Sequence, residues 1–116
     1  MMVAMLTASN GKKLRCIVWL DSGADHCVFP VSFAIALGLD PLQMQQQLTG
    51  GVGNTGNNTF YDDLTIALDN GPTFITKVGF TAGLEAQGFG LLGQAGFFEN
   101  FTVTFDQKSR LFHIEH

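Results

Sequence analysis

Apolar and polar residues alternate in short runs, and turn residues separate the runs. Asn10-Gly11 stands between two apolar runs, and Asp69-Asn70-Gly71 stands between two more. These are strong hairpin signals, because asparagine, aspartate and glycine tolerate the positive φ of tight turns. A third, looser hairpin turns through Asp106 to Ser109. We therefore predict strands at Val3–Ala8, Lys13–Asp21, Phe60–Leu68, Thr73–Thr81, Phe101–Phe105 and Arg110–Glu115.

The middle of the chain gives a weaker pattern. From Pro41, the residues Leu42, Met44, Gln46 and Leu48 alternate with three glutamines, which predicts a strand with one solvated face. It enters "TGGVGNTGNN", residues 49–58, which forms either the tip of a long hairpin or an irregular loop. Two short helices are expected. The first is "PVSFAIALG", with Pro30 near its start, Ser32 as a cap and Gly38 at its end, and the second is "QAGFFENF" after Gly93.

These elements predict a mainly β fold, either a small barrel or a sandwich. A chain of 116 residues fits one domain, which we place at residues 1–116. With 46% hydrophobic and only 14% charged residues, the chain can bury a core and does not resemble a disordered segment. Eleven phenylalanines predict that this core is aromatic.

Charge and hydropathy exclude several classes of partner. The net charge is −4 and no basic cluster is present, so nucleic acid is not expected as a partner. No apolar stretch reaches the roughly 20 residues of a membrane span, so no membrane partner is expected either. The segment "MMVAML" lacks the basic start of a signal peptide, which favours the cytoplasm unless a leader has been removed. Cys16 and Cys27 are expected to be buried free thiols.

One strand ends in an unusual way. The run "CIVWL" is apolar at every position, so we expect its strand to be central and buried. It leads directly into Asp21, followed by Ser22 and Gly23. Burying a carboxylate at the end of an apolar strand costs free energy unless the group is hydrogen-bonded or protonated. By itself the triplet fits an ordinary turn, in which the aspartate accepts backbone N–H groups.

Three segments in order change that interpretation. "LDSGAD" at residues 20–25, the glycine-rich "TGGVGN" at 49–54 and "GLLGQAGF" at 90–97 together resemble the retropepsin-like aspartic proteases. They match that family's catalytic motif, flap and second hydrophobic-hydrophobic-glycine motif. The segments after the first and third motifs are more similar to cellular and bacterial members than to viral ones. The resemblance implies a small closed acid-protease barrel with one or two short helices.

The resemblance also implies roles for single residues. Asp21 would be the catalytic acid and base. Ser22 would stabilise the site through a hydrogen bond made by its hydroxyl group, and the backbone of Gly23 would contact the substrate. Asp25 would anchor the substrate main chain, but Gln94 stands where the family has the arginine that pairs with it. The residues expected to bind substrate are Ala24, Asp25, His26, the flap residues Gly50, Gly51, Val52 and Gly53, and Leu91.

The number of catalytic motifs implies an assembly. Peptide hydrolysis by this route needs two carboxylates around one water, and the chain has a single Asp-Ser-Gly. The resemblance therefore implies a homodimer whose two Asp21 carboxyls share one proton on the symmetry axis. It would be an endopeptidase acting on an extended peptide or protein, with no metal and no organic cofactor.

Three alternatives stay open at this point. The domain could be an inactive dimerisation or peptide-binding module that adds a peptide strand to its sheet. Asp21, Asp25, His26 and Cys27 contain metal-ligand types, but close neighbours on one turn cannot all converge on one ion. A serine hydrolase built on Ser22 would lack the usual G-x-S-x-G turn.

Overall fold

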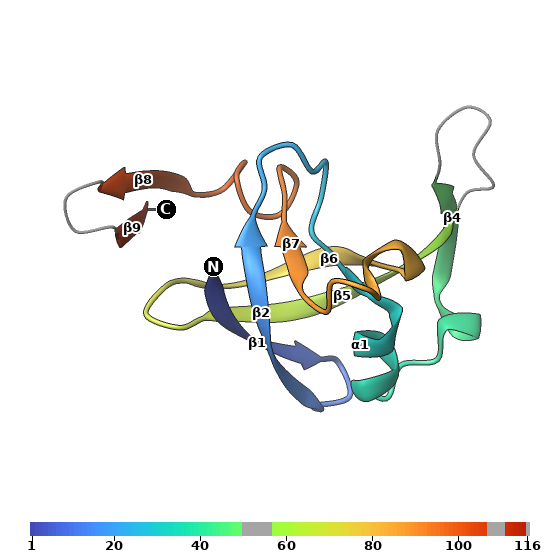
Figure 1. Ribbon diagram of the computed structural model, residues 1–116. Helices are drawn as coiled ribbons and strands as arrows, with labels where there is room; N and C mark the ends of the chain where they lie inside the picture. The colour runs from blue at the N-terminus through green and yellow to red at the C-terminus, as the bar shows by residue number, and fades with distance from the viewer. Residues whose placement is uncertain (50–56, 107–110, 116) are drawn as a thin grey trace.

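A barrel of six strands forms the body of the molecule (Figure 1). The computed structural model describes residues 1–49, 57–106 and 111–115. Strands pair in the order β1-β2-β7-β3-β6-β5, and β5 pairs again with β1 to close the barrel. The strands are β1 Met2–Ala8, β2 Lys13–Leu20, β3 Val28–Pro30, β4 Gln45–Thr49, β5 Asn57–Leu68, β6 Thr73–Thr81, β7 Gly90–Leu92, β8 Thr102–Asp106 and β9 Leu111–Glu115.

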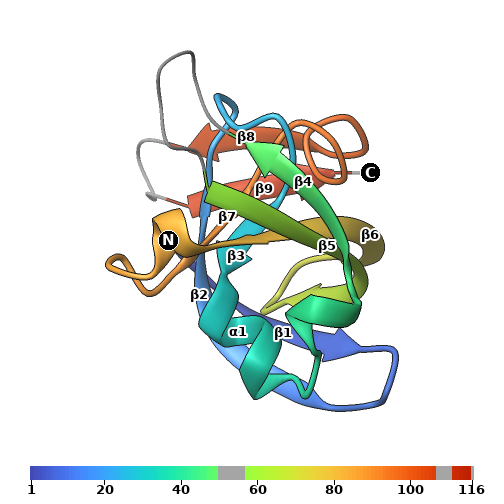
Figure 2. The ribbon, with the colours of Figure 1, turned by 90° about the vertical axis from the view of Figure 1, so that its right-hand side faces the viewer.

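The remaining strands extend from this barrel. In the described part of the chain β4 pairs with β5 alone, and β8 pairs with β9 as a separate two-stranded sheet. In Figure 1 the β8–β9 hairpin lies to the left of the barrel and β4 to its right, and Figure 2 shows the same elements from the side. The described residues contain one α-helix, α1 Val31–Ala36, and two 3₁₀ turns, η1 Pro41–Gln43 and η2 Ala82–Leu84. The prediction of a mainly β closed barrel is confirmed, with one short helix.

The predicted hairpins form where the turn residues stand. Gly11 has φ +87°, and its N–H donates to the carbonyl of Ala8. Asn70 has φ +57° in the β5–β6 turn, where the Gly71 N–H donates to the carbonyl of Leu68. The third hairpin joins β8 to β9, and its connection at 107–110 lies outside the described residues. Turn chemistry therefore accounts for the β1–β2 and β5–β6 pairings.

Two predicted elements are wrong in detail. Residues 41–43 form the 3₁₀ turn η1 instead of the start of a strand, because the Asp40 side chain accepts the Leu42 N–H and caps the turn. Residues 94–101 form a series of turns instead of a second helix. Gly96 has φ +96°, and the Phe98 N–H reaches the Gly93 carbonyl five residues back, so the helical ladder is not made.

The helix α1 begins differently from the prediction and ends as expected. Ser32 does not cap it with its side chain; the Ser32 N–H instead donates to the Glu85 carboxylate at 2.7 Å. Glu85 comes directly after η2, so a distant segment supplies the negative charge that favours a helix start. At the other end Gly38 has φ +72°, and the Leu39 N–H donates to the Ala34 carbonyl, which is a Schellman closure.

The strand β2 is central in the sheet but not buried on both faces. It pairs with β1 on one side and with β7 on the other. Val18 faces the core, whereas Ile17 and Trp19 are 41% and 44% exposed. Trp19 packs on Phe89 outside the core, with ring centroids 6.0 Å apart. The expectation of a fully buried strand is therefore wrong, because the barrel covers only the inner face of its strands.

Aromatic side chains dominate the core, as the composition predicts. Phe29, Phe80 and Phe97 are completely buried. Phe97 contacts the rings of Phe74 and Phe101 with centroids 5.7 and 5.3 Å away. These contacts attach the turns at 94–101 to β6, so the segment after β7 is packed in place although it is not a helix.

Cys27 is a buried free thiol, and its chemistry gives a prediction. Its side chain is 0% exposed and its sulfur donates to the Ala95 carbonyl at 3.8 Å. Burial raises the pKa of the Cys27 thiol to about 11. Since only the thiolate is nucleophilic, we expect iodoacetamide to leave Cys27 unmodified in the native protein at pH 8 and to alkylate it in urea. Rapid native alkylation, detected by mass spectrometry, would contradict this burial.

Candidate active site

Asp21 lies immediately after β2, at a point fixed by the neighbouring strand. β2 and β7 run parallel, with Leu20 opposite Leu92. The Asp21 N–H donates to the Leu92 carbonyl at 2.9 Å, which extends this pairing by one residue. Asp21 itself is only partly buried. The sheet thus holds the backbone of this residue, which is not fully buried.

The turn after Asp21 fixes the side chain as well. The Gly23 N–H donates to Asp21 Oδ1 at 2.9 Å, and the Ala24 N–H donates to the Asp21 carbonyl at 3.0 Å. The carboxylate therefore accepts a turn hydrogen bond through one oxygen, as the sequence suggested. Ser22 and Gly23 are exposed in the protomer. A carboxylate with one bonded oxygen keeps acceptor capacity for another partner.

A second segment supports the loop at residues 22–26. The backbone N–H of Gln94 donates to the Ala24 carbonyl at 2.8 Å, and that of Ala95 donates to the Asp25 carbonyl at 2.8 Å. His26 forms a parallel bridge with Ala95. The first motif and the segment after β7 are thus joined by backbone hydrogen bonds.

Gly93 makes this close approach possible. A Cβ atom at position 93 would lie 2.5 Å from the His26 carbonyl oxygen and 2.7 Å from that of Ala24. Contacts that short do not occur, and backbone atoms cannot move aside as a flexible side chain can. The glycine of "GLLG" is therefore required by the packing of the two loops.

A small pocket adjoins the loop. It has a volume of about 250 Å³ and combines part of the predicted set with residues from β5 and β6. Its lining residues are Ala24, Asp25, His26, Val28, Thr59 and Thr81. Three residues predicted to bind substrate are therefore together in one concave site, which is the usual form of a ligand pocket.

His26 has an aromatic partner that sequence reasoning missed. The Tyr61 hydroxyl and His26 Nε2 are 3.2 Å apart, and the two ring centroids are 5.5 Å apart. Burial raises the pKa of Tyr61, so its hydroxyl is protonated at neutral pH. Tyr61, Thr59 and Thr81 come from paired strands, and only the sheet register brings them to the loop. No local motif marks them.

The other residues predicted to bind substrate lie outside this pocket or outside the described residues. Gly50, Gly51, Val52 and Gly53 lie outside the described residues, so the flap stays a prediction. Leu91 is half-buried in β7, opposite Trp19 on β2 and Val28 on β3. It does not line the 250 Å³ pocket, and its contact with substrate also stays a prediction.

The side chain at position 94 makes a hydrogen bond and not an ion pair. Gln94 Nε2 donates to the Ser22 carbonyl at 2.7 Å, so its side chain reaches across the start of the loop. The Asp25 side chain is exposed and makes no hydrogen bond or ion pair with another described residue. Among the described residues, no group of three histidine, cysteine, aspartate or glutamate side chains is placed to hold a metal ion.

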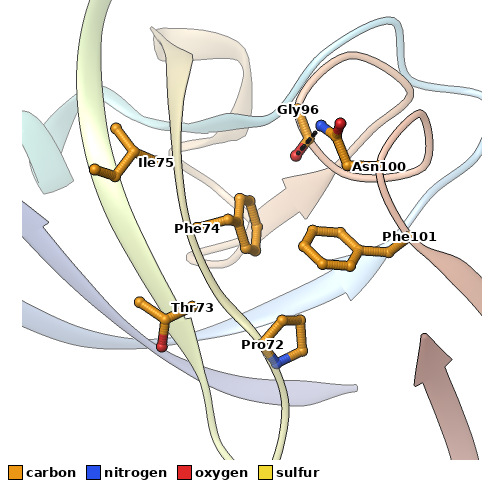
Figure 3. A pocket seen from close by; sticks show the side chains of 7 residues that line it. All are labelled: Pro72, Thr73, Phe74, Ile75, Gly96, Asn100 and Phe101. Atoms are coloured by element: carbon orange, nitrogen blue, oxygen red, sulfur yellow. Dashed lines mark hydrogen bonds between the residues drawn. The ribbon is translucent and has the colours of Figure 1, made fainter. Parts of the chain in front are cut away.

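A larger pocket of about 520 Å³ lies at the start of β6 (Figure 3). Phe74 and Phe101 turn their rings toward each other there, with centroids 5.3 Å apart. Asn100 Nδ2 donates to the Gly96 carbonyl at its rim. Its lining has no carboxylate, histidine, lysine or cysteine side chain, so size alone does not make it the candidate catalytic site.

Comparison with known proteins gives one informative likeness. The chain is similar in structure to a retropepsin-like aspartic protease from Rickettsia conorii, with a TM-score of 0.60 over 96% of this chain and 81% of that chain. The two sequences are 20% identical, so the likeness shows the fold. No protein-family model matches the chain, and no curated protein matches it. Among the described residues, no helix is long and apolar enough to cross a membrane.

Proposed function

We propose that the chain is an aspartic endopeptidase that acts as a homodimer. The observation that carries the proposal is the position of Asp21: it follows β2, its N–H donates to the Leu92 carbonyl of β7, and the residue is partly exposed beside a pocket-lining loop. The retropepsin-like fold supports the general kind of activity, a hydrolase of peptide bonds. The substrate would be an extended peptide or protein segment.

The mechanism needs two copies of Asp21 around one water molecule. The ionised carboxyl takes a proton from the water as its oxygen attacks the scissile carbonyl carbon. The protonated carboxyl donates a hydrogen bond to the carbonyl oxygen and stabilises the tetrahedral intermediate. A proton then passes to the leaving nitrogen as the C–N bond breaks, which regenerates one ionised and one protonated carboxyl.

The β8–β9 hairpin supports the assembly part of the proposal. It is a two-stranded sheet that extends from the barrel, as Figure 1 shows. An isolated two-stranded hairpin is marginally stable in water, and its open edges can pair with another chain. The matching hairpin of a second copy is a suitable partner, because a two-fold axis brings identical surfaces together.

The proposal is tested by a peptide-library cleavage assay with and without a pepstatin-type inhibitor, together with mass measurements at several protein concentrations. We expect cleavage that the inhibitor blocks and a mass that shifts from monomer to dimer. Peptide binding without cleavage would instead support the inactive module. Full activity in excess chelator is also expected, and loss of activity there would favour a metal site.

A further inference from the structure

We propose that Gln94 is a positioning residue for the catalytic loop, residues 21–26: its neutral side chain hydrogen-bonds to the Ser22 carbonyl and so joins this loop to the segment after β7. This inference rests on the proposed function and deepens it. The hydrogen bond from Gln94 Nε2 to the Ser22 carbonyl is 2.7 Å long and joins residues 72 positions apart in the chain.

The side-chain bond completes a series of three contacts from one segment. The Gln94 N–H holds the Ala24 carbonyl, and the Ala95 N–H holds the Asp25 carbonyl. The side-chain amide of Gln94 also donates to the Ser22 carbonyl, which of the three carbonyls is the nearest to Asp21 in the chain. Three carbonyls of the loop, those of Ser22, Ala24 and Asp25, are thus held by residues 94 and 95.

The bond at Ser22 controls the geometry of the catalytic carboxyl. Asp21 Oδ1 accepts the Gly23 N–H, so the side chain is oriented by the peptide group that joins Ser22 to Gly23. The Ser22 carbonyl belongs to that same peptide group. A donor on this carbonyl therefore restricts rotation of the N–H that orients Asp21, because the peptide unit is planar.

An amide side chain at position 94 has two consequences. A glutamine donor carries no charge, so the restraint on the loop does not change with pH. It also leaves the exposed Asp25 carboxylate without an ion pair from residue 94, at the edge of the 250 Å³ pocket. The loop is fixed through a backbone carbonyl, and the carboxylate of Asp25 stays available to a bound peptide.

Two near-isosteric substitutions remove the hydrogen-bond donor of residue 94 while they keep the approximate shape of its side chain. Gln94→Met removes the donor at every pH, whereas Gln94→Glu removes it only while the introduced carboxyl is ionised. When protonated, that carboxyl has an O–H group that can donate to the Ser22 carbonyl. An unperturbed glutamate titrates near pH 4.3, so recovery is expected as the pH falls to about 4.

The charged and titratable groups around position 94 favour this recovery. The loop that faces it carries Asp21, Asp25 and His26. The following turn carries Glu99, whose N–H donates to the Gln94 carbonyl. The three carboxylates disfavour a further negative charge, so the introduced group should become protonated at a higher pH than usual. A protonated His26 would oppose this effect.

The experiment measures kcat and KM on one cleavable peptide from pH 3.5 to 7, each variant relative to wild type. At pH 6.5 we expect kcat to fall about fivefold in both variants with little change in KM, the factor for a hydrogen bond worth about 1 kcal/mol. At pH 4 the Gln94→Glu variant should return to nearly wild-type kcat and the Gln94→Met variant should not. Equal kcat in all three proteins at every pH would overturn the proposal.

A second readout does not depend on activity. Amide hydrogen exchange of Ala24 should quicken in Gln94→Met, whereas the Leu68 amide, bonded to the Pro72 carbonyl in the β5–β6 turn, should be unchanged. If the wild type cleaves nothing, the proposed function fails while this exchange still tests the restraint. Unchanged exchange at Ala24 would overturn the role of Gln94 even if the protein is an active peptidase.

Discussion

Replacing Asp21 with asparagine is expected to abolish peptide cleavage, with kcat reduced at least about 10³-fold. The asparagine amide can neither take a proton from water nor share one with a second carboxyl. The fold should be retained, because the Oδ1 atom of asparagine can still accept the Gly23 N–H. Cleavage of a peptide substrate, followed by mass spectrometry of the products, measures the effect.

A matched variant controls for loss of any surface aspartate. Asp63 is exposed on β5 and does not line the 250 Å³ pocket beside the loop that follows Asp21. Asp63→Asn makes the same change of charge and shape, and its kcat should stay within about twofold of wild type. If Asp21→Asn retains the activity of Asp63→Asn, Asp21 is not the catalytic carboxylate.

Replacing Gly93 with alanine is expected to destabilise the protein by about 3 kcal/mol or more. The added Cβ would lie 2.5 Å from the His26 carbonyl oxygen and 2.7 Å from that of Ala24, so the backbone of the loop at residues 21–26 must move. Activity should fall together with stability, because the displaced loop carries Asp21. Urea unfolding measures the free energy of unfolding.

The control for this substitution is Gly88→Ala. Gly88 has a backbone that favours glycine, with φ +72°, whereas Gly93 has not, and a Cβ atom at position 88 meets nothing within 4 Å. This substitution should lower the free energy of unfolding by backbone strain alone, about 1 kcal/mol. Equal losses for both variants would show that the contact with the loop carbonyls is not what requires glycine at position 93.

Local chemistry makes much of this fold predictable from the sequence. The Asn10-Gly11 and Asn70-Gly71 turns set hairpins because their backbone angles suit few other residues. The Asp-Ser-Gly turn was predictable in the same way, since the aspartate accepts an N–H two residues ahead. The predicted roles of the turn residues in catalysis require a substrate and a second copy of the chain, so they remain predictions.

The parts that could not be predicted depend on contacts between distant segments. β3 and β7 have three residues each, too few for a periodic pattern, and they form because β6 and β2 pair with them. The substitution of glutamine for arginine at position 94 was visible in the sequence. That its amide would reach the Ser22 carbonyl was not, because the reach depends on how the two loops meet.

The central claim is that each active site takes one Asp21 from each of two copies of the chain. Mixing wild-type protein with excess Asp21→Asn protein, under conditions where subunits exchange, tests it most directly. At a ninefold excess, random pairing leaves about one tenth of the wild-type subunits in wild-type dimers, so activity should fall to about one tenth. Activity that stays constant as the inactive variant is added would contradict the shared site.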